Sequence, residues 1–176
     1  KKNDGTYTFK MPDGEVTIEA KFVQIYAYSD CPKDEVCPIH DFADASITAW
    51  YHDGVHYCIE NGLMNGLTTT QFAPGGTTTR AQIVTILWRL EGKPVADYAM
   101  SFTDVAAGQW YTEAVRWAAS EGIVLGRSDT EFAPNAAITR EQMAAILHRY
   151  CQYKEIDVSV GEETNILSFD DAFALP

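Results

Sequence analysis

Residues 102–151 read FTDVAAGQWYTEAVRWAASEGIVLGRSDTEFAPNAAITREQMAAILHRYC, and residues 42–91 read FADASITAWYHDGVHYCIENGLMNGLTTTQFAPGGTTTRAQIVTILWRLE. The two stretches align at a constant offset of 60 residues without a gap, and 17 of the 50 aligned positions are identical. Self-similarity at a fixed period indicates one small structural unit used more than once, which buries its apolar face by stacking on its neighbour. The repeat therefore decides the fold.

The identical positions fall in three blocks, and their spacing predicts the structure of each unit. In the first unit the blocks are Phe42, Asp44, Trp50, Tyr51 and Val55, then Gly62, Gly66, Phe72, Ala73 and Pro74, then Thr79, Arg80, Gln82, Ile86, Leu87 and Arg89. In the second unit the counterparts are Phe102, Asp104, Trp110, Tyr111 and Val115, then Gly122, Gly126, Phe132, Ala133 and Pro134, then Thr139, Arg140, Gln142, Ile146, Leu147 and Arg149. Each unit is predicted to be a helix, a glycine-punctuated loop and a second helix.

Local signals place the helix ends. The first helix of each unit begins near the Trp-Tyr pair, and Gly62 or Gly122 ends it, because a glycine just past the last turn adopts the left-handed conformation that satisfies the final carbonyls. The second helix opens with Thr79 or Thr139. A threonine followed three residues later by glutamine is a capping box.

The rest of the chain is divided by composition. Residues 5–29 alternate with period two around a Met-Pro-Asp-Gly turn, which predicts a β-hairpin. The opening Phe-x-Asp recurs at Phe169 and Asp171, so we expect a third repeat cut short at Pro176 and a chain that is part of a longer polypeptide. The predicted order is a hairpin remnant of a preceding domain (1–29), a cysteine-containing linker (30–41), the first repeat (42–94), a linker (95–101), the second repeat (102–152), a linker (153–167) and the start of the third repeat (168–176).

Composition and charge exclude several classes of function. The 176 residues are 46% hydrophobic, enough for a core, and no run approaches the roughly 18 apolar residues of a membrane span. The net charge of −12 repels nucleic acid and anionic membranes. We therefore expect neither nucleic-acid binding nor membrane insertion.

The four cysteines form no Cys-x-x-Cys pair, so the spacing of a zinc ribbon is missing. Cys31 and Cys37 bracket a polar connector and are a candidate disulfide that would hold the start of the first repeat. The main rival pairing is Cys37 with Cys58. Cys58 is equally well interpreted as a small buried hydrophobe, since it corresponds to Ala118 on the apolar side of the first helix.

His52 and His56 share one helical face, as in a zinc-binding helix. The second repeat has Thr112 and Arg116 at these positions, and no third ligand is evident from the sequence, so we expect no metal site and no cofactor. No nucleophile motif, phosphate-binding loop or recognisable carboxylate pair is present either. The chain is not expected to be an enzyme.

Phe-x-Asp, Trp-Tyr, Ala-Val, Gly-Ile-Val-x-Gly, Phe-x-Pro and Thr-Arg-Glu, in this order and spacing, resemble the S-layer homology repeat. The match is strongest over residues 102–150 and nearly as good over 42–90. The resemblance implies a mainly α fold in which three such repeats form a pseudo-threefold assembly. It also implies an extracellular module of the cell surface that binds secondary cell-wall polysaccharide, often through pyruvylated sugars.

The candidate ligand-binding residues are taken from positions that are identical in the two repeats. Arg80 and Arg140 lie at the first turn of a helix, whose free N–H groups and positive dipole end favour an anion, and each guanidinium could grip a carboxylate. Trp50 and Trp110 would offer a sugar an apolar face, and Asp44 and Asp104 would accept hydroxyl hydrogen bonds. The set of candidate ligand-binding residues is completed by Thr79, Thr139, Gln82 and Gln142.

Each residue type also has a purely structural interpretation. The tryptophans could be core residues, the aspartates helix caps or turn formers, and the arginines partners in salt bridges between repeats. The threonines and glutamines are expected to be caps first and ligand contacts second.

The predicted function is noncovalent anchoring of a surface protein to cell-wall polysaccharide. The alternative is a protein-interaction or self-assembly module of a surface layer, with self-association through the incomplete third repeat. A third hypothesis is a spacer that holds another domain without binding anything.

Overall fold

The structure is a computed structural model that describes residues 31–158. It divides the chain into two units, Lys1–Cys31 and Pro32–Pro176. The four helices of the described residues belong to the second unit. The predicted hairpin (1–29) and the predicted start of a third repeat (168–176) lie outside the described residues.

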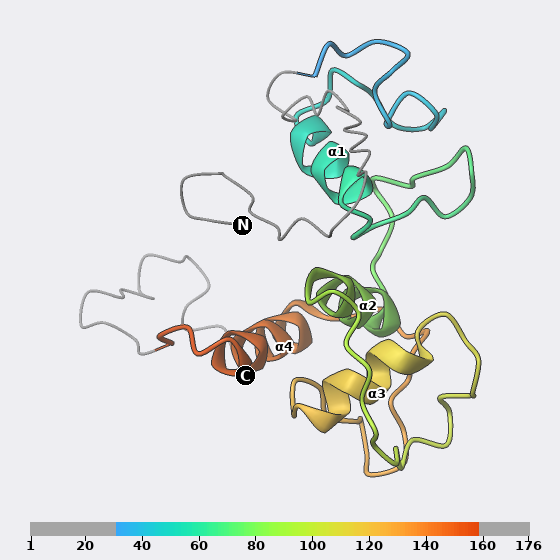
Figure 1. The fold of residues 1–176 in the computed structure, drawn as a ribbon. Coiled ribbons are helices and arrows are strands. Elements are labelled where there is room, and N and C mark those ends of the chain that lie inside the picture. The colour runs from blue at the N-terminus through green and yellow to red at the C-terminus, as the bar shows by residue number, and fades with distance from the viewer. Residues whose placement is uncertain (1–30, 159–176) are drawn as a thin grey trace, which may run out of the picture. The chain divides into compact units, whose positions relative to one another are not determined.

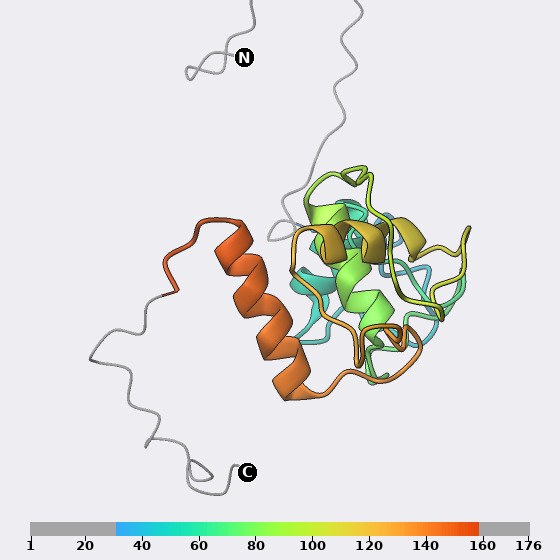
Figure 2. The same ribbon diagram turned by 90° about the horizontal axis from the view of Figure 1, so that it is seen from below.

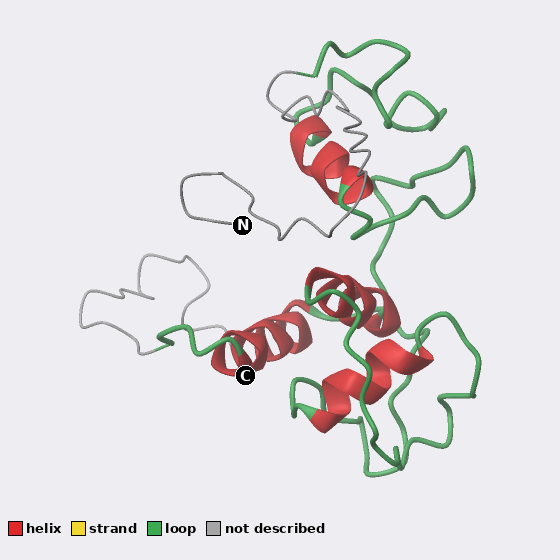
Figure 3. Cartoon of the chain, in the orientation of Figure 1, coloured by secondary structure: helices red, strands yellow, loops and turns green. Residues whose placement is uncertain are grey.

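Helices and loops make up the described part of the chain (Figure 1 and Figure 3), and residues 31–158 contain no named strand. The helices are α1 (His52–Glu60), α2 (Arg80–Leu90), α3 (Thr112–Ser120) and α4 (Arg140–Tyr153). The starts of α3 and α4 follow those of α1 and α2 by the 60 residues of the repeat, so the predicted helix–loop–helix units are confirmed. None of these helices combines the length and the apolar character that crossing a bilayer requires.

The first helix of each repeat ends as its glycine predicts. Gly62 and Gly122 have φ values of 64° and 67°. The next residue then donates its N–H back into the last turn, Leu63 to the Cys58 carbonyl and Ile123 to the Ala118 carbonyl, each at 2.8 Å. Leu63 and Ile123 are both buried, which completes the capping motif with an apolar contact.

The second helix of each repeat begins at the predicted threonine cap. In α2 both halves of the capping box form: the Thr79 hydroxyl accepts from the Gln82 N–H, and the Gln82 side chain accepts from the Thr79 N–H. In α4 the Thr139 hydroxyl accepts from the Gln142 N–H. The Gln142 amide oxygen instead faces the first repeat, where Arg80 approaches it at 3.4 Å.

The hydrophobic core joins the two repeats. Helix α2 of the first repeat packs against α3 of the second, and Figures 1 and 2 show these helices side by side from two directions. Apolar residues from α2, α3, the segments before and after α3, and α4 make up this core: Ala81, Val84, Leu87, Val105, Tyr111, Ala114, Val115, Trp117, Ala118, Ile123, Val124, Phe132 and Ile146. The packing unit therefore crosses the boundary between the repeats.

The far end of α4 is tied to the end of α2. The Tyr150 hydroxyl donates to one oxygen of Glu91, and Lys154 Nζ lies 3.0 Å from the other. The bond from Tyr150 outweighs the opposing effect of desolvation and, together with the bond from Lys154, holds the pKa of Glu91 below its ordinary value. Trp117 of α3 also meets the Tyr153 ring edge to face, at a centroid distance of 5.7 Å.

The loops between the paired helices are held by an aspartate. Asp104 accepts the backbone N–H groups of Phe132 and Ala133 at 2.9 and 2.6 Å. This bracing holds Ala133 at a φ of 58°, a left-handed conformation that costs a non-glycine residue about 1–2 kcal/mol. Asp44 accepts the N–H groups of Phe72 and Ala73 in the same way, at 2.8 Å each.

Each loop also needs its second glycine. A Cβ on Gly66 would collide with the Phe42 ring and with the Thr68 carbonyl, and a Cβ on Gly126 would collide with Phe102 and the Ser128 carbonyl. The two phenylalanines of each repeat lie together, with ring centroids 5.6 Å apart for Phe42 and Phe72. The repeated Phe-x-Asp, glycine and Phe-Ala-Pro motifs thus build one braced loop per repeat.

Replacing Asp104 by alanine should lower the free energy of unfolding by about 1–3 kcal/mol, because two backbone N–H groups lose a charged acceptor. Chemical denaturation followed by circular dichroism measures this change. Asp129→Ala is the control, since Asp129 is exposed in the loop that Asp104 braces and its side chain makes no hydrogen bond or ion pair with the described residues. Equal effects of the two substitutions would contradict the bracing role.

Stability should also depend on the charge of Asp44. The N–H of Phe72 lowers the pKa of Asp44 below its ordinary value of 3.8 by more than desolvation raises it, and the N–H of Ala73 adds to the lowering. A carboxyl with a lowered pKa stabilises the folded state above its unfolded pKa and loses that contribution as pH falls through its folded pKa. The difference in unfolding free energy between the wild type and Asp44→Asn should therefore be largest at neutral pH and shrink below pH 3.8. A difference independent of pH would contradict this.

Candidate binding groove

A surface groove of about 480 Å³ lies along the first repeat and ends at one residue of the second. Its volume falls in the range of roughly 300–1,000 Å³ typical of small-molecule sites. It is lined by the loop and second helix of the first repeat together with Trp110: Leu63, Met64, Asn65, Gly66, Leu67, Phe72, Ala73, Pro74, Gly76, Thr77, Thr78, Gln82, Thr85, Ile86, Arg89 and Trp110. The mixture of apolar, hydroxyl and amide side chains suits a polar ligand with apolar faces.

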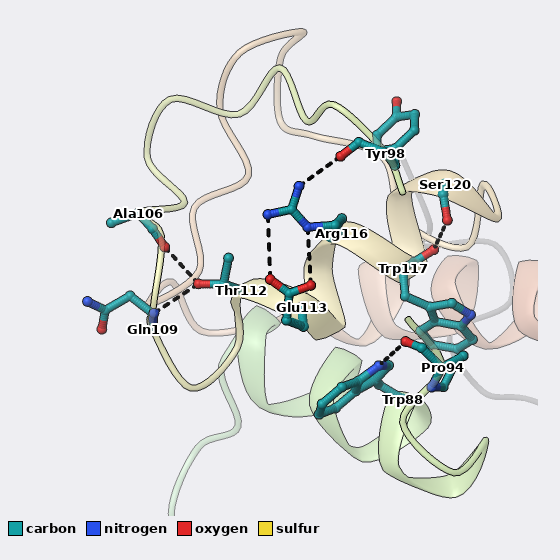
Figure 4. Close-up of polar contacts among 10 residues, drawn as sticks. All are labelled: Trp88, Pro94, Tyr98, Ala106, Gln109, Thr112, Glu113, Arg116, Trp117 and Ser120. Carbon is teal, nitrogen blue, oxygen red and sulfur yellow. Dashed lines mark hydrogen bonds and ion pairs between the residues drawn. The ribbon is translucent and has the colours of Figure 1, made fainter. Parts of the chain in front are cut away.

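Trp110 forms part of the groove wall and is 55% exposed. The Tyr111 ring packs edge to face against it at a centroid distance of 5.1 Å. The turn before Trp110 is also fixed, because the Thr112 hydroxyl accepts from the Gln109 N–H and donates to the Ala106 carbonyl (Figure 4). Trp110 is thus an exposed ring on a supported turn, and its interpretation as a core residue is wrong.

Trp50 occupies the equivalent position in the first repeat but does not line the groove. Its side chain is 95% exposed. Trp50 and Trp110 are therefore both surface residues, and only Trp110 belongs to the groove.

Arg89 is the only charged residue that lines the groove in the described part of the chain. One of its terminal nitrogens donates to the Leu63 carbonyl at 3.1 Å, which fixes the side chain beside the loop. The candidate set drawn from the sequence omitted Arg89. The available signal was its identity with Arg149 at the same position of the second repeat.

Arg80 has a different position from the one expected of a carboxylate anchor. It is only 5% exposed, and its guanidinium donates to the carbonyls of Phe132 and Leu125 at 2.8 and 3.0 Å. It also lies over the Phe132 ring, 4.8 Å from the centroid. Burial, and then repulsion from Arg127, lowers the pKa of Arg80. The prediction that Arg80 grips a ligand carboxylate is wrong for this geometry, because the second repeat occupies its donors.

The backbone at the start of α2 is occupied as well. The N–H groups of Arg80 and Ala81 donate to the carbonyls of Ala136 and Pro134, each at 3.0 Å. The N–H of Ile138 returns a bond to Thr78, beside an isolated antiparallel bridge between Thr79 and Ala137. This helix end therefore offers no free N–H pair to an anion, contrary to the expectation from sequence.

Arg140, the counterpart of Arg80, is exposed at the start of α4. Within residues 31–158 its guanidinium has no recorded hydrogen bond or ion pair. It does not line the groove. Its role as a ligand contact stays a prediction.

The remaining candidates have structural contacts. Thr79, Gln82 and Thr139 form side-chain helix caps, as expected, and of these Gln82 also lines the groove. The Gln142 side chain does not cap α4 and accepts from Arg80 instead. Asp44 and Asp104 act as loop braces, the turn-forming role that the sequence left open, and neither lines the groove. The four cysteines are thiols in the structure, and burial raises the pKa of Cys58.

The fold and the groove define a tandem helical repeat module with a tryptophan and an arginine in a surface groove. The family model of the S-layer homology domain matches residues 41–84 and 101–144, which together make up half of the chain. The chain belongs to the S-layer homology domain family. Membership in this family indicates a location at the cell surface.

Similar proteins include a hydrolase and two proteins named for surface-layer or anchoring roles. The chain is 35% identical over 122 residues to an endoglucanase of Bacillus sp. (strain KSM-635), a match that covers 69% of this chain and 13% of the relative. It is 33% identical over 107 residues to the S-layer protein sap of Bacillus anthracis, covering 60% and 13%. It is 24% identical over 139 residues to a cellulosome-anchoring protein of Acetivibrio thermocellus, covering 76% and 30%. A segment shared by a hydrolase and an S-layer protein supports a non-enzymatic module, and the chain spans only a small part of these relatives.

The contrast between Arg80 and Arg140 gives a matched pair of substitutions. Arg80→Ala should lower the free energy of unfolding by about 2–4 kcal/mol, because the carbonyls of Phe132 and Leu125 lose a charged donor. Arg140→Ala should change it by less than about 0.5 kcal/mol. Denaturant titration of the two variants measures both values, and equal effects would show that Arg80 does not join the repeats.

Proposed function

We propose that this chain anchors a surface protein to the cell wall by binding secondary cell-wall polysaccharide in the groove that Trp110 completes. The ligand that fits is an acidic glycan, with a pyruvylated sugar as the acidic unit. The observation that carries the proposal is the placement of an exposed tryptophan and a fixed arginine in one groove. The cellulosome-anchoring and S-layer proteins among its relatives support the same role.

The chemistry of the groove explains how an acidic protein can hold an acidic polymer. At a net charge of −12 the chain repels a polyanion at long range. Arg89 acts at short range, where a guanidinium binds a carboxylate through charge-assisted hydrogen bonds of about 1.5–3 kcal/mol. Thr77, Thr78, Asn65 and Gln82 supply hydroxyl and amide groups for sugar hydroxyls. We expect such binding to be specific for the acid group and to strengthen with salt that screens the repulsion.

The alternative is assembly with other protein chains. Arg140 and the exposed Leu147 on α4 are the observations that favour it, because the equivalent helix α2 is covered by the second repeat. Self-assembly would not depend on the acid group of a glycan. The two functions are therefore separable by removing that group.

Binding should be tested by sedimentation of the chain with purified Gram-positive cell-wall sacculi, before and after mild acid treatment that removes pyruvate ketals. Trp110→Ala should weaken binding by about tenfold or more, the loss typical of an aromatic anchor, and Arg89→Ala by roughly 10- to 150-fold. Acid treatment should have an effect comparable to that of Arg89→Ala.

Trp50→Ala and Arg149→Ala are the matched controls, since they remove the same residue types at equivalent positions outside the groove. Circular dichroism of every variant excludes misfolding as the cause of a loss. Binding that survives acid treatment and both groove substitutions would overturn the proposal. Self-association that persists under the same conditions would favour the alternative.

A further inference from the structure

Four potential metal ligands meet at the start of the first repeat. Cys37, His52 and His56 are all buried, and Cys31, which directly precedes Pro32, is buried as well. One ligand atom from each of the four residues lies within 4.8 Å of the others. Two sulfurs and two imidazole nitrogens are the ligand set of a structural zinc site.

The distances fit a tetrahedral ion. In a site with Zn–S bonds of 2.3 Å and Zn–N bonds of 2.0–2.1 Å, neighbouring ligand atoms lie roughly 3.3–3.8 Å apart. Cys37 Sγ lies 3.4 Å from His52 Nε2 and 3.9 Å from His56 Nδ1. The two sulfur–nitrogen distances therefore differ from those of a closed site by only a few tenths of an ångström.

The second ring nitrogen of each histidine faces a carboxylate. His52 Nδ1 lies 2.7 Å from Asp53, and His56 Nε2 lies 3.8 Å from Glu60. Histidines that bind a metal usually donate their other N–H to a carboxylate, which orients the ring and raises the basicity of the ligating nitrogen. Both rings thus point one nitrogen at the sulfur and the other at an acid.

The sequence argument against a metal rested on the absence of the histidines from the second repeat and on the lack of a third ligand, and the structure supplies a third ligand. The histidines follow the His-x₃-His spacing of a zinc site, and the cysteines are separated by five residues, one more than the usual maximum. The extra residue falls in a tight connector, where Lys33 has a φ of 55° and the Cys37 N–H donates to the Asp34 carbonyl at 3.0 Å. The longer spacing is therefore compatible with convergence of the ligands.

The cluster belongs to the first repeat alone. The counterparts of His52 and His56 are Thr112 and Arg116, and Thr112 holds the preceding turn by hydrogen bonds. Helix α3 buries four apolar residues, including Val115 and Trp117, in the core with α2. Helix α1 buries only its two histidines. An ion would supply to α1 the anchoring that apolar burial supplies to α3.

We propose that Cys31, Cys37, His52 and His56 form a structural zinc site that fastens the connector before the first repeat to α1. Protein side chains would supply all four ligands of the ion, which is typical of a structural rather than a catalytic zinc site. The main rival is the disulfide between Cys31 and Cys37. A disulfide leaves the two buried imidazoles without a partner at the sulfur, whereas an ion uses all four groups.

The test uses the full chain, purified under reducing conditions, stripped with a chelator and titrated with Zn²⁺ or Co²⁺. We expect one ion per chain by elemental analysis. We also expect the visible absorption of tetrahedral Co²⁺ together with a thiolate-to-metal charge-transfer band. Hydrogen exchange should show that Zn²⁺ protects α1 and leaves the protection of α2 and α3 unchanged, because the ion does not touch their core.

Substitutions assign the ligands. Cys37→Ser and His52→Thr, which installs the residue of the second repeat, should each reduce Zn²⁺ affinity by more than 100-fold. Asp53→Asn should reduce it 10- to 100-fold, the usual effect of losing a carboxylate behind a ligating histidine. Cys151→Ser and His40→Ala are the controls and should bind Zn²⁺ like the wild type, since neither residue belongs to the cluster.

Two outcomes would overturn the proposal. One is a reduced chain that binds no Zn²⁺ at micromolar concentration while retaining its helical circular dichroism spectrum. The other is binding that Cys151→Ser or His40→Ala abolishes and Cys37→Ser leaves intact. Mass spectrometry of the unreduced chain reports a Cys31–Cys37 disulfide directly, and its presence without metal binding after reduction would establish the rival.

Discussion

Arg80 and the first turn of α2 hold the two repeats together, and the groove depends on that contact. The guanidinium donates to Phe132 and Leu125, and two backbone N–H groups of the same turn donate to Ala136 and Pro134. These bonds bring the loop of the second repeat onto the start of α2, while apolar residues join α2 to α3. Trp110, at the start of α3, then reaches the groove formed by the first repeat. Arg80 was predicted to bind the ligand, and it instead holds the two repeats in the arrangement that forms the groove.

Equivalent positions in the two repeats are consequently not equivalent in the structure. The braces Asp44 and Asp104 do the same work in each loop, because their partners belong to their own repeat. Arg80 and Arg140 differ because the partners of Arg80 belong to the next repeat. The same reasoning separates Trp110 from Trp50, since the groove beside Trp110 is formed by the preceding repeat. Residues that act within a repeat keep their role, and residues that act between repeats change it.

The distinction between contacts within a repeat and contacts between repeats also explains which features could be predicted from the sequence. Helix starts, glycine stops and threonine caps were predicted correctly, because each depends on neighbours within a few residues. The role of Arg80 was missed, because its partners are backbone carbonyls, which leave no residue signature 45 and 52 positions away. Trp110 and Gln82 were identified as candidates and do line the groove, whereas Arg89 was overlooked despite its repetition. The histidine pair was seen, but its partner Cys37 comes from a connector whose path only the structure reveals.

The two halves of the described chain rely on different forces. The α2–α3 pair has a dry core that includes Val84, Trp117 and Ile123, so its cohesion is hydrophobic. The buried residues of helix α1 are two histidines, whereas most buried residues of α3 are apolar, so the cohesion of α1 depends on polar contacts. Polar clusters are sensitive to pH, chelators and oxidants, whereas an apolar core is not. The groove is lined by the loop of the first repeat, α2 and Trp110, and no residue of α1 belongs to its wall. Anchoring and the integrity of the connector before α1 are therefore separable properties of one chain.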